Sequence, residues 1–365
     1  MSRATVPLEA VVGGLRAEGL LREEQAAEAD ALIAELRAGQ PWYVRAMVAV
    51  GAWLASFQVI GFVAAFGIMV GGYVIVGLAL IAGAVALRRK YDNDFVVQAT
   101  LAASLAGQAL LAWGIADLGD AESIELLCTV IIVMSGVLFF IFPDRIHRVL
   151  SVLFAASALT VLLYAWEWNA AVPVLGPALA AALVLVHRNR AALTAAGHGH
   201  LVRPLESGLM LSAFGCLLLS TVYLLPELDL EFVFYPRPWI STLLLGALFL
   251  YVGSFTLQPL AAGTGRAAVP VTYALMLAVI ACAWAAPGLL LALIVTLLGA
   301  GAGQRTFTGA GIAFLAVFVT AYFYGMETTL LTKSITLVAT GAAVLVARWI
   351  LLLFVRDRHA GDTHA

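Results

Sequence analysis

A lysine and a glutamate near the end of the chain are the first candidates for chemistry, because they lie beside a long apolar run. Glu327 precedes this run, and Lys333 lies just inside it. Ionisable groups are costly within a membrane and therefore often mark substrate or ion pathways. Two interpretations of Lys333 stay open: it binds an anionic group inside a helix bundle, or its long side chain reaches the lipid headgroups. Glu327 is a candidate counter-ion, although six residues is a poor spacing for pairing along one helix.

A second candidate is a short turn in which two tryptophans flank an acid: Trp166, Glu167 and Trp168. The tryptophans either anchor the turn at the membrane surface, where such rings are enriched, or form a site for a sugar or a lipid headgroup. Flat rings stack on sugars, and a carboxylate accepts hydrogen bonds from hydroxyl groups. Arg348 is a third candidate, near the end of the last apolar run, with Glu206 as one conceivable partner.

Patterns for metal, nucleotide and nucleophile chemistry are weak. His187, His198 and His200 lack the spacing of a zinc frame. The glycine-rich stretch 299–305 lacks the Gly-Lys-Ser/Thr ending of a phosphate-binding loop, and small-residue helix packing explains it better. The sequence therefore predicts no metal site, no cofactor and no catalytic residue, and it favours a protein that is not an enzyme.

Composition points to a membrane protein. The chain has 365 residues, of which 63% are hydrophobic and 12% charged. Soluble domains average about 45–50% apolar and about 25% charged residues, so a soluble globular enzyme is excluded. The net charge of −2 gives no sign of nucleic-acid binding.

The apolar runs predict an all-α polytopic bundle of about twelve membrane helices. Tight joints between some runs also leave a count of ten or eleven open. Residues 1–41 form a cytoplasmic amphipathic helical hairpin, residues 42–355 the bundle, and residues 356–365 a cytoplasmic tail. The predicted spans are 44–65, 68–87, 95–115, 124–142, 148–166, 169–187, 205–225, 239–257, 267–284, 286–303, 306–325 and 330–351.

The distribution of positive charge predicts the orientation. With the N-terminus inside and twelve alternating spans, 18 of the 20 lysine and arginine residues fall on the cytoplasmic side. Only Arg237 and Lys333 fall outside. Such a split follows the positive-inside rule, so we expect a multi-pass protein of the bacterial inner membrane with both termini in the cytoplasm.

Several short motifs resemble a bacterial polytopic membrane family known as domain of unknown function 4401. They are Trp42-Tyr43-Val44-Arg45, Gly51-Ala52-Trp53-Leu54-Ala55, Tyr322-Phe323-Tyr324, Leu330-Leu331-Thr332-Lys333-Ser334, Gly341 and Arg348. The N-terminal hairpin, with Glu18-Gly19-Leu20-Leu21 and Glu24-Gln25-Ala26, is similar to the opening of the related 2157 family. The resemblance implies an inner-membrane protein that is often encoded beside a small partner with a Gly-Asp-Tyr motif. It supplies no catalytic residues.

Three functions stay open. The first is transporter-like or flippase-like handling of a small anionic or lipid-linked envelope substrate, with Lys333 as an anion-binding group. The second is a non-catalytic membrane scaffold that holds a small membrane-anchored partner. The third is a membrane-embedded enzyme acting on lipid-linked substrates. Membrane lipids surround the protein in each case, and the sequence does not determine its oligomeric state.

Overall fold

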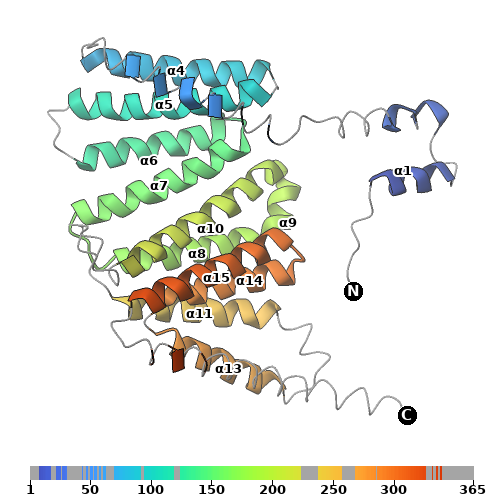
Figure 1. The fold of residues 1–365 in the computed structure, drawn as a ribbon, viewed down its shortest axis with the longest axis vertical. Coiled ribbons are helices and arrows are strands. Elements are labelled where there is room, and N and C mark those ends of the chain that lie inside the picture. Colours follow the sequence, from blue (N-terminus) through green and yellow to red (C-terminus); the bar gives the residue numbers. More distant parts are fainter. Residues whose placement is uncertain are drawn as a thin grey trace. The chain divides into compact units, whose positions relative to one another are not determined.

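The computed structural model describes most of the chain between residues 8 and 338 (Figure 1). Every regular element in this part is helical. Two compact units share the chain: the first holds residues 1–68 and 79–107, and the second holds residues 69–78 and 108–365. The described residues are 8–17, 22–25, 27–30, scattered positions between 43 and 62, 70–91, 94–118, 124–222, 237–256, 268–284, 286–325, and positions 331, 334, 335 and 338.

The first unit begins with short helices. Helix α1 covers Leu8–Ala17, and residues 23–25 and 27–30 are also helical. An exposed ion pair of 3.8 Å joins Arg16 to Asp30. Helices α4 (Val70–Lys90) and α5 (Asp94–Leu118) are long, and each contributes to both units.

The second unit is a stack of helices joined mostly by short turns. One corner interrupts the pattern: the short helix α9 and the π-helical turn η1 connect α8 to α10. Gly197 makes this corner possible, because its φ of 85° suits glycine. The bounds are α6 (Ile124–Ile141), α7 (Arg145–Ala165), α8 (Val172–Arg188), α9 (Arg190–Leu193), η1 (Thr194–His198), α10 (Gly199–Val222), α11 (Pro238–Thr256), α13 (Ala268–Cys282), α14 (Pro287–Gly301) and α15 (Arg305–Gly325).

The second to eleventh predicted spans each coincide with one long helix, from α4 to α15. Six described helices are long and apolar enough to cross a membrane, and four shorter helices are apolar. The chain is therefore a polytopic helical protein suited to a membrane. The first and last predicted spans, 44–65 and 330–351, fall mostly outside the described residues, so the count of twelve stays a prediction.

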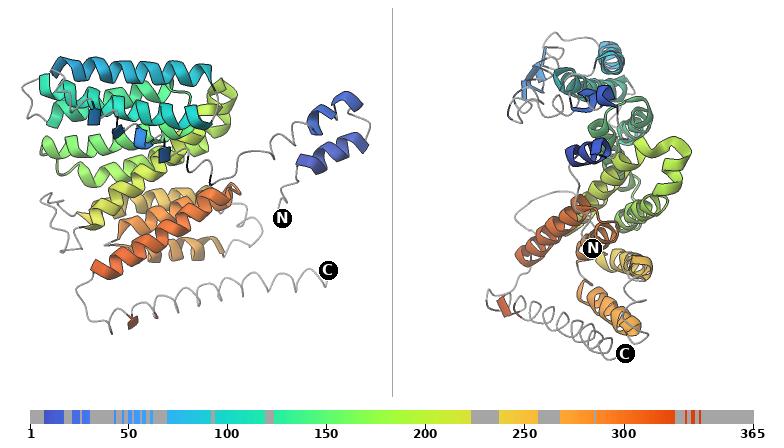
Figure 2. Two further views of the ribbon diagram at one scale, coloured as in Figure 1. Left: turned by 45° about the horizontal axis from the view of Figure 1, so that its top comes forward. Right: turned by 90° about the vertical axis from the view of Figure 1, so that its right-hand side faces the viewer.

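The apolar core of the second unit lies between α8, α10, α11, α14 and α15. Phe214 of α10 stacks on Phe314 of α15 with ring centres 3.7 Å apart. Helices α14 and α15 lie side by side (Figure 2) and approach closely at glycines. A Cβ at Gly299 would lie 2.7 Å from Thr308 Oγ1, so the interpretation of stretch 299–305 as small-residue packing is confirmed at this residue. Fully buried members of this core are Leu183, Leu245, Leu290, Leu291, Ile294 and Leu298.

Two prolines inside helices free backbone carbonyls, and neighbouring helices bond both. Proline lacks an N–H, so the carbonyl four residues earlier loses its helical partner. Pro177 frees the carbonyl of Pro173, which accepts from Ser241 Oγ of α11 at 2.6 Å. Pro204 frees the carbonyl of His200, which accepts from Arg148 of α7. This is how a membrane helix tolerates proline, because lipid offers the freed carbonyl no water.

Replacing Ser241 by alanine is expected to lower the free energy of unfolding by about 1–2 kcal/mol, because the partly buried Pro173 carbonyl is left without a donor. Ser241→Ala should lower the free energy of unfolding less when Pro177 is also replaced by alanine, because the restored N–H of residue 177 can then donate to the Pro173 carbonyl. Detergent unfolding of the two single variants and the double variant measures this coupling. Thr320→Ala is the control, because that hydroxyl bonds within its own exposed helix. Equal losses in both backgrounds would contradict the assignment.

Candidate functional site

Contacts between helices fix their relative directions in the second unit. Arg148 bonds to the carbonyl of His200 near the start of α7 and α10, and Thr160 contacts Cys216 farther along both helices. These two helices are therefore parallel. Helix α8 runs antiparallel to α10, because its last turn meets the early part of α10, where the carboxyl group of Glu206 lies.

One end of the second unit collects positive charge, and we call it the basic end. The start of α7, the end of α8 and the start of α10 meet there. Between residues 124 and 325, all described arginines except Arg237 belong to this end. Arg237 precedes α11, whose far end contacts the end of α8. The arginines of the basic end are Arg145, Arg148, Arg188, Arg190, Arg203 and Arg305.

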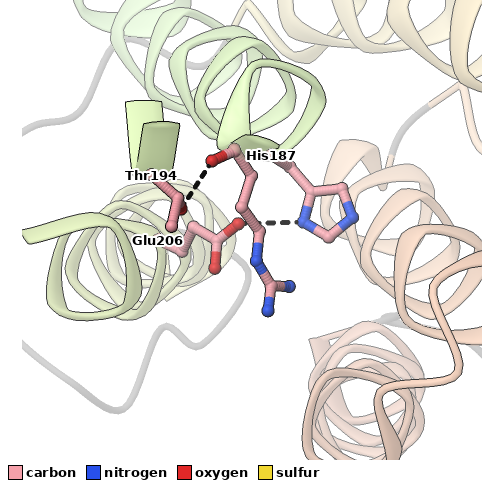
Figure 3. A network of polar contacts seen from close by, with 4 residues as sticks. His187, Thr194 and Glu206 are labelled. Atoms are coloured by element: carbon pink, nitrogen blue, oxygen red, sulfur yellow. Dashed lines mark hydrogen bonds and ion pairs between the residues drawn. The ribbon is translucent and has the colours of Figure 1, made fainter. Parts of the chain in front are cut away.

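A buried acid and a histidine face each other at the basic end (Figure 3). Glu206 Oε1 of α10 lies 3.0 Å from His187 Nδ1 of α8, and the two side chains are 2% and 11% exposed. The ring of Phe307 from α15 packs 6.0 Å from the imidazole. In the adjoining corner formed by α9 and η1, the Thr194 hydroxyl donates a hydrogen bond to the Arg190 carbonyl at 2.8 Å. Burying a carboxyl group is costly without a partner, so the imidazole is what makes this position tolerable for Glu206.

A second histidine is buried at the start of α7. His147 Nε2 lies 3.1 Å from the Gln108 amide nitrogen, and Nδ1 lies 3.3 Å from Ser151 Oγ. The amide nitrogen can only donate, so Nε2 accepts and Nδ1 carries the proton that is directed at the serine. The Ser151 hydroxyl donates in turn to the His147 carbonyl at 3.0 Å. Phe142 stacks on the ring at 4.0 Å, so this histidine is held rigidly.

Arg148 beside it is also buried, with 8% of its surface exposed. Its guanidinium donates to the Phe139 carbonyl at 3.1 Å and to the His200 carbonyl at 3.5 Å. Both acceptors are carbonyls that their own helices leave unpaired, at the end of α6 and before Pro204. Asp144 caps α7 by accepting from the backbone N–H groups of Ile146 and His147 at 2.8 and 3.0 Å. This arginine therefore ties three helices together.

The predicted Trp–Glu–Trp turn lies at the far end of α7, away from the basic end. Trp166 and Trp168 are exposed, and their rings contact each other with centres 5.5 Å apart. A ligand would therefore bind on the outer faces of the rings, because no slot separates them. Glu167 follows the end of α7 and has a left-handed backbone conformation, with φ at 58°. The backbone N–H groups of Glu167 and Trp168 bond to Tyr164 and Leu163, which is a Schellman ending.

Replacing Glu167 by glycine is expected to raise the free energy of unfolding by about 1 kcal/mol, because a Cβ is unfavourable at this φ. Gly303 ends α14 in the same way, with φ at 66°. Gly303→Ala should therefore lower stability by about the same amount. Thermal unfolding in detergent compares the two variants, and a loss of stability in Glu167→Gly would show that the carboxylate makes a compensating contact.

The other predicted site residues, Lys333, Glu327 and Arg348, lie outside the described residues. Glu206, considered as a partner for Arg348, contacts His187 in the part that the structure describes, and its pairing with Arg348 stays a prediction. Within that part, no group of three or more His, Cys, Asp or Glu side chains could hold a metal ion.

The sequence-based prediction missed both buried histidines, because it weighed His187 only as a metal ligand and did not consider His147. One signal was available for His147. Pro143-Asp144 is a helix-start pattern, and it places His147 and Arg148 in the first turn of α7. No comparable signal marks His187 and Glu206, which are 19 residues apart on different helices.

Comparison with known proteins identifies a family but assigns no activity. The family described as "Domain of unknown function (DUF4401)" matches residues 41–354. No curated protein matches the chain.

Proposed function

The chain belongs to this family, and on that premise we propose that it is a transporter-like protein of the bacterial inner membrane. Its substrate is a small anionic or lipid-linked molecule of the cell envelope. The observation that carries the proposal is the buried His187–Glu206 pair within an apolar helical protein. Ionisable groups in such surroundings characterise proton and substrate pathways, and histidine changes charge readily near neutral pH.

The pair suits proton-coupled movement of an anion. A carboxyl group and an imidazole in contact can take up or release a proton without leaving their apolar surroundings. An anion that crosses together with a proton carries no net charge, which avoids the cost of moving a bare charge through hydrocarbon. The arginines of the basic end create a positive potential that concentrates anions beside the pair.

We place the basic end at the cytoplasmic face, with both termini inside, because arginine-rich ends of membrane helices face the cytoplasm. Lys333 and Glu327 then lie near the outer face, where the lysine binds the anionic group of the substrate. The Trp166–Trp168 turn lies at the same face, and Arg348 lies near the inner one. These placements rest on the charge pattern of the sequence.

Glu206→Gln is expected to lower pH-driven anion uptake about tenfold or more, because glutamine keeps the hydrogen bond to His187 but exchanges no proton. Proteoliposomes with an imposed pH gradient measure uptake of a panel of small anions, and a fluorescent phospholipid reports lipid translocation. Glu125→Gln is the matched control, because Glu125 is exposed at the start of α6. If Glu206→Gln took up anions at the wild-type rate, the His187–Glu206 pair would have a structural role only.

A membrane scaffold is the second candidate, and the N-terminal helices support it. Helix α1 exposes Leu15 with 37% of its surface accessible, and Arg16 and Asp30 form an ion pair in solvent. An amphipathic helix such as α1 suits packing of its apolar face against a helix of a small membrane-anchored partner. Affinity purification of full-length protein and of a variant without residues 1–41 would test this, since a scaffold loses its partner on truncation and retains a folded bundle.

A further inference from the structure

The last residue of α8 holds its positive charge against two aromatic rings of α11. The Arg188 Cζ atom lies 5.5 Å from the centre of the Tyr251 ring and 5.4 Å from that of Phe255. The two rings meet edge to face at 70°, with centres 5.5 Å apart. The guanidinium also donates a hydrogen bond from Nη1 to the Tyr251 hydroxyl. The side chain is thus held in one place by cation–π contacts and a hydrogen bond.

No carboxylate within the described part of the chain forms a salt bridge with Arg188, and the residue is exposed. Because the Tyr251 hydroxyl accepts from the guanidinium, its own O–H is left to donate. A planar guanidinium fork and a hydroxyl donor therefore converge on one exposed position, which matches the geometry and charge of a phosphate group.

The surroundings of this position suit a lipid. Leu185 lies three residues before Arg188 on the same face of α8 and is 55% exposed. Leu244 lies seven residues before Tyr251 on the same face of α11 and is 42% exposed. The two helices run parallel, since Pro173 bonds to Ser241 near their starts and Arg188 meets Tyr251 farther along. Both leucines therefore lie on the side away from the basic end, where an acyl chain would extend.

We propose that Arg188, Tyr251 and Phe255 bind the phosphate of an anionic phospholipid, with its acyl chain along Leu185 and Leu244. Arg188 and the Tyr251 hydroxyl bind the phosphate oxygens, and Phe255 keeps the guanidinium in position. Basic sites between membrane helices commonly recognise lipid headgroups in this way. The site shares Arg188 with the basic end, but it uses neither His187 nor Glu206, so lipid binding can be tested apart from transport.

Native mass spectrometry of the purified full chain tests the site, with phosphatidylglycerol and phosphatidylcholine titrated separately. We expect phosphatidylglycerol to bind at least about fivefold more tightly, and Arg188→Gln to remove that preference. Arg188→Lys keeps the charge but loses the planar fork, so it should recover only part of the preference. Tyr251→Phe should weaken binding about threefold through loss of one donor.

Arg237→Gln is the matched control, because Arg237 is also exposed and lies at the opposite end of α11. It should leave the lipid preference unchanged. Unfolding without added lipid shows whether Arg188→Gln is still folded, and Tyr251→Phe provides a milder variant if it is not. Equal lipid preference in Arg188→Gln and the wild type would overturn the proposal. So would equal stabilisation by inorganic phosphate alone, which would indicate a site for a soluble anion.

Discussion

Replacing His187 by leucine is expected to lower the free energy of unfolding by about 3–5 kcal/mol, one of the two largest effects predicted for this protein. The change leaves the Glu206 carboxyl group buried, with its 3.0 Å partner removed. Breaking one side of a buried pair is costly because the remaining group has lost its water and gained no replacement. Unfolding of the purified protein in mixed detergent micelles measures the loss.

The double variant His187→Leu/Glu206→Leu separates two explanations of that loss. If the cost comes from the unpartnered acid, the double variant should recover to within about 1 kcal/mol of the wild type, because both polar groups are gone. If leucine at 187 simply fits badly beside Phe307, the double variant should stay as unstable as the single one. His198→Leu is the control, since His198 is exposed in the η1 corner.

Replacing Gly311 by valine is expected to lower the free energy of unfolding by about 3 kcal/mol, because α14 and α15 lie too close together at this residue to admit a side chain. A Cβ on Gly311 would lie 2.8 Å from Thr296 N and 2.9 Å from the Ala292 carbonyl. Both are backbone atoms, so no rotamer change relieves the clash. The two helices would have to separate, and a movement of α15 would also disturb the stacking of its Phe314 on Phe214 of α10.

Gly309→Val is the matched control on the same helix. A Cβ at Gly309 meets nothing within 4 Å, so this variant should stay within about 0.5 kcal/mol of the wild type. Detergent unfolding compares the two valine variants directly. Similar losses in both would mean that valine disturbs the helix itself and that close packing is not the cause.

The sequence predicted the helices well because a membrane helix needs one property that can be read locally, a long apolar run. The apolar runs from 68–87 to 306–325 each coincide with a helix. The break between the predicted spans 267–284 and 286–303 also agrees with the structure, in which α13 ends at Cys282 and α14 begins at Pro287. Small-residue packing could be predicted at Gly299, because glycines repeated in an apolar helix have few other uses.

The buried polar pairs could not be predicted, because they depend on how neighbouring helices are rotated about their axes. Glu206 could be seen to lie in an apolar run, but several helices could have supplied its partner. Its partner is His187, and the histidine reaches it only because the α9–η1 corner brings α10 back beside α8. The same holds for Gln108 and His147, which are 39 residues apart. The prediction placed Arg148 at the cytoplasmic start of the span 148–166, and the structure shows its side chain buried near the start of α7.

The two carbonyls that Pro177 and Pro204 leave unpaired affect the order in which the helices can pack during synthesis. When α8 leaves the ribosome, the carbonyl of Pro173 has no donor, because Ser241 is synthesised 68 residues later. The carbonyl of His200 differs, since Arg148 has already been made when α10 emerges. Helices α7 and α10 can therefore dock as soon as both have been inserted, whereas α8 keeps an unpaired carbonyl until α11 arrives. A chain truncated between α10 and α11 should consequently be retained by the insertion machinery and degraded, and one truncated after α11 should escape it.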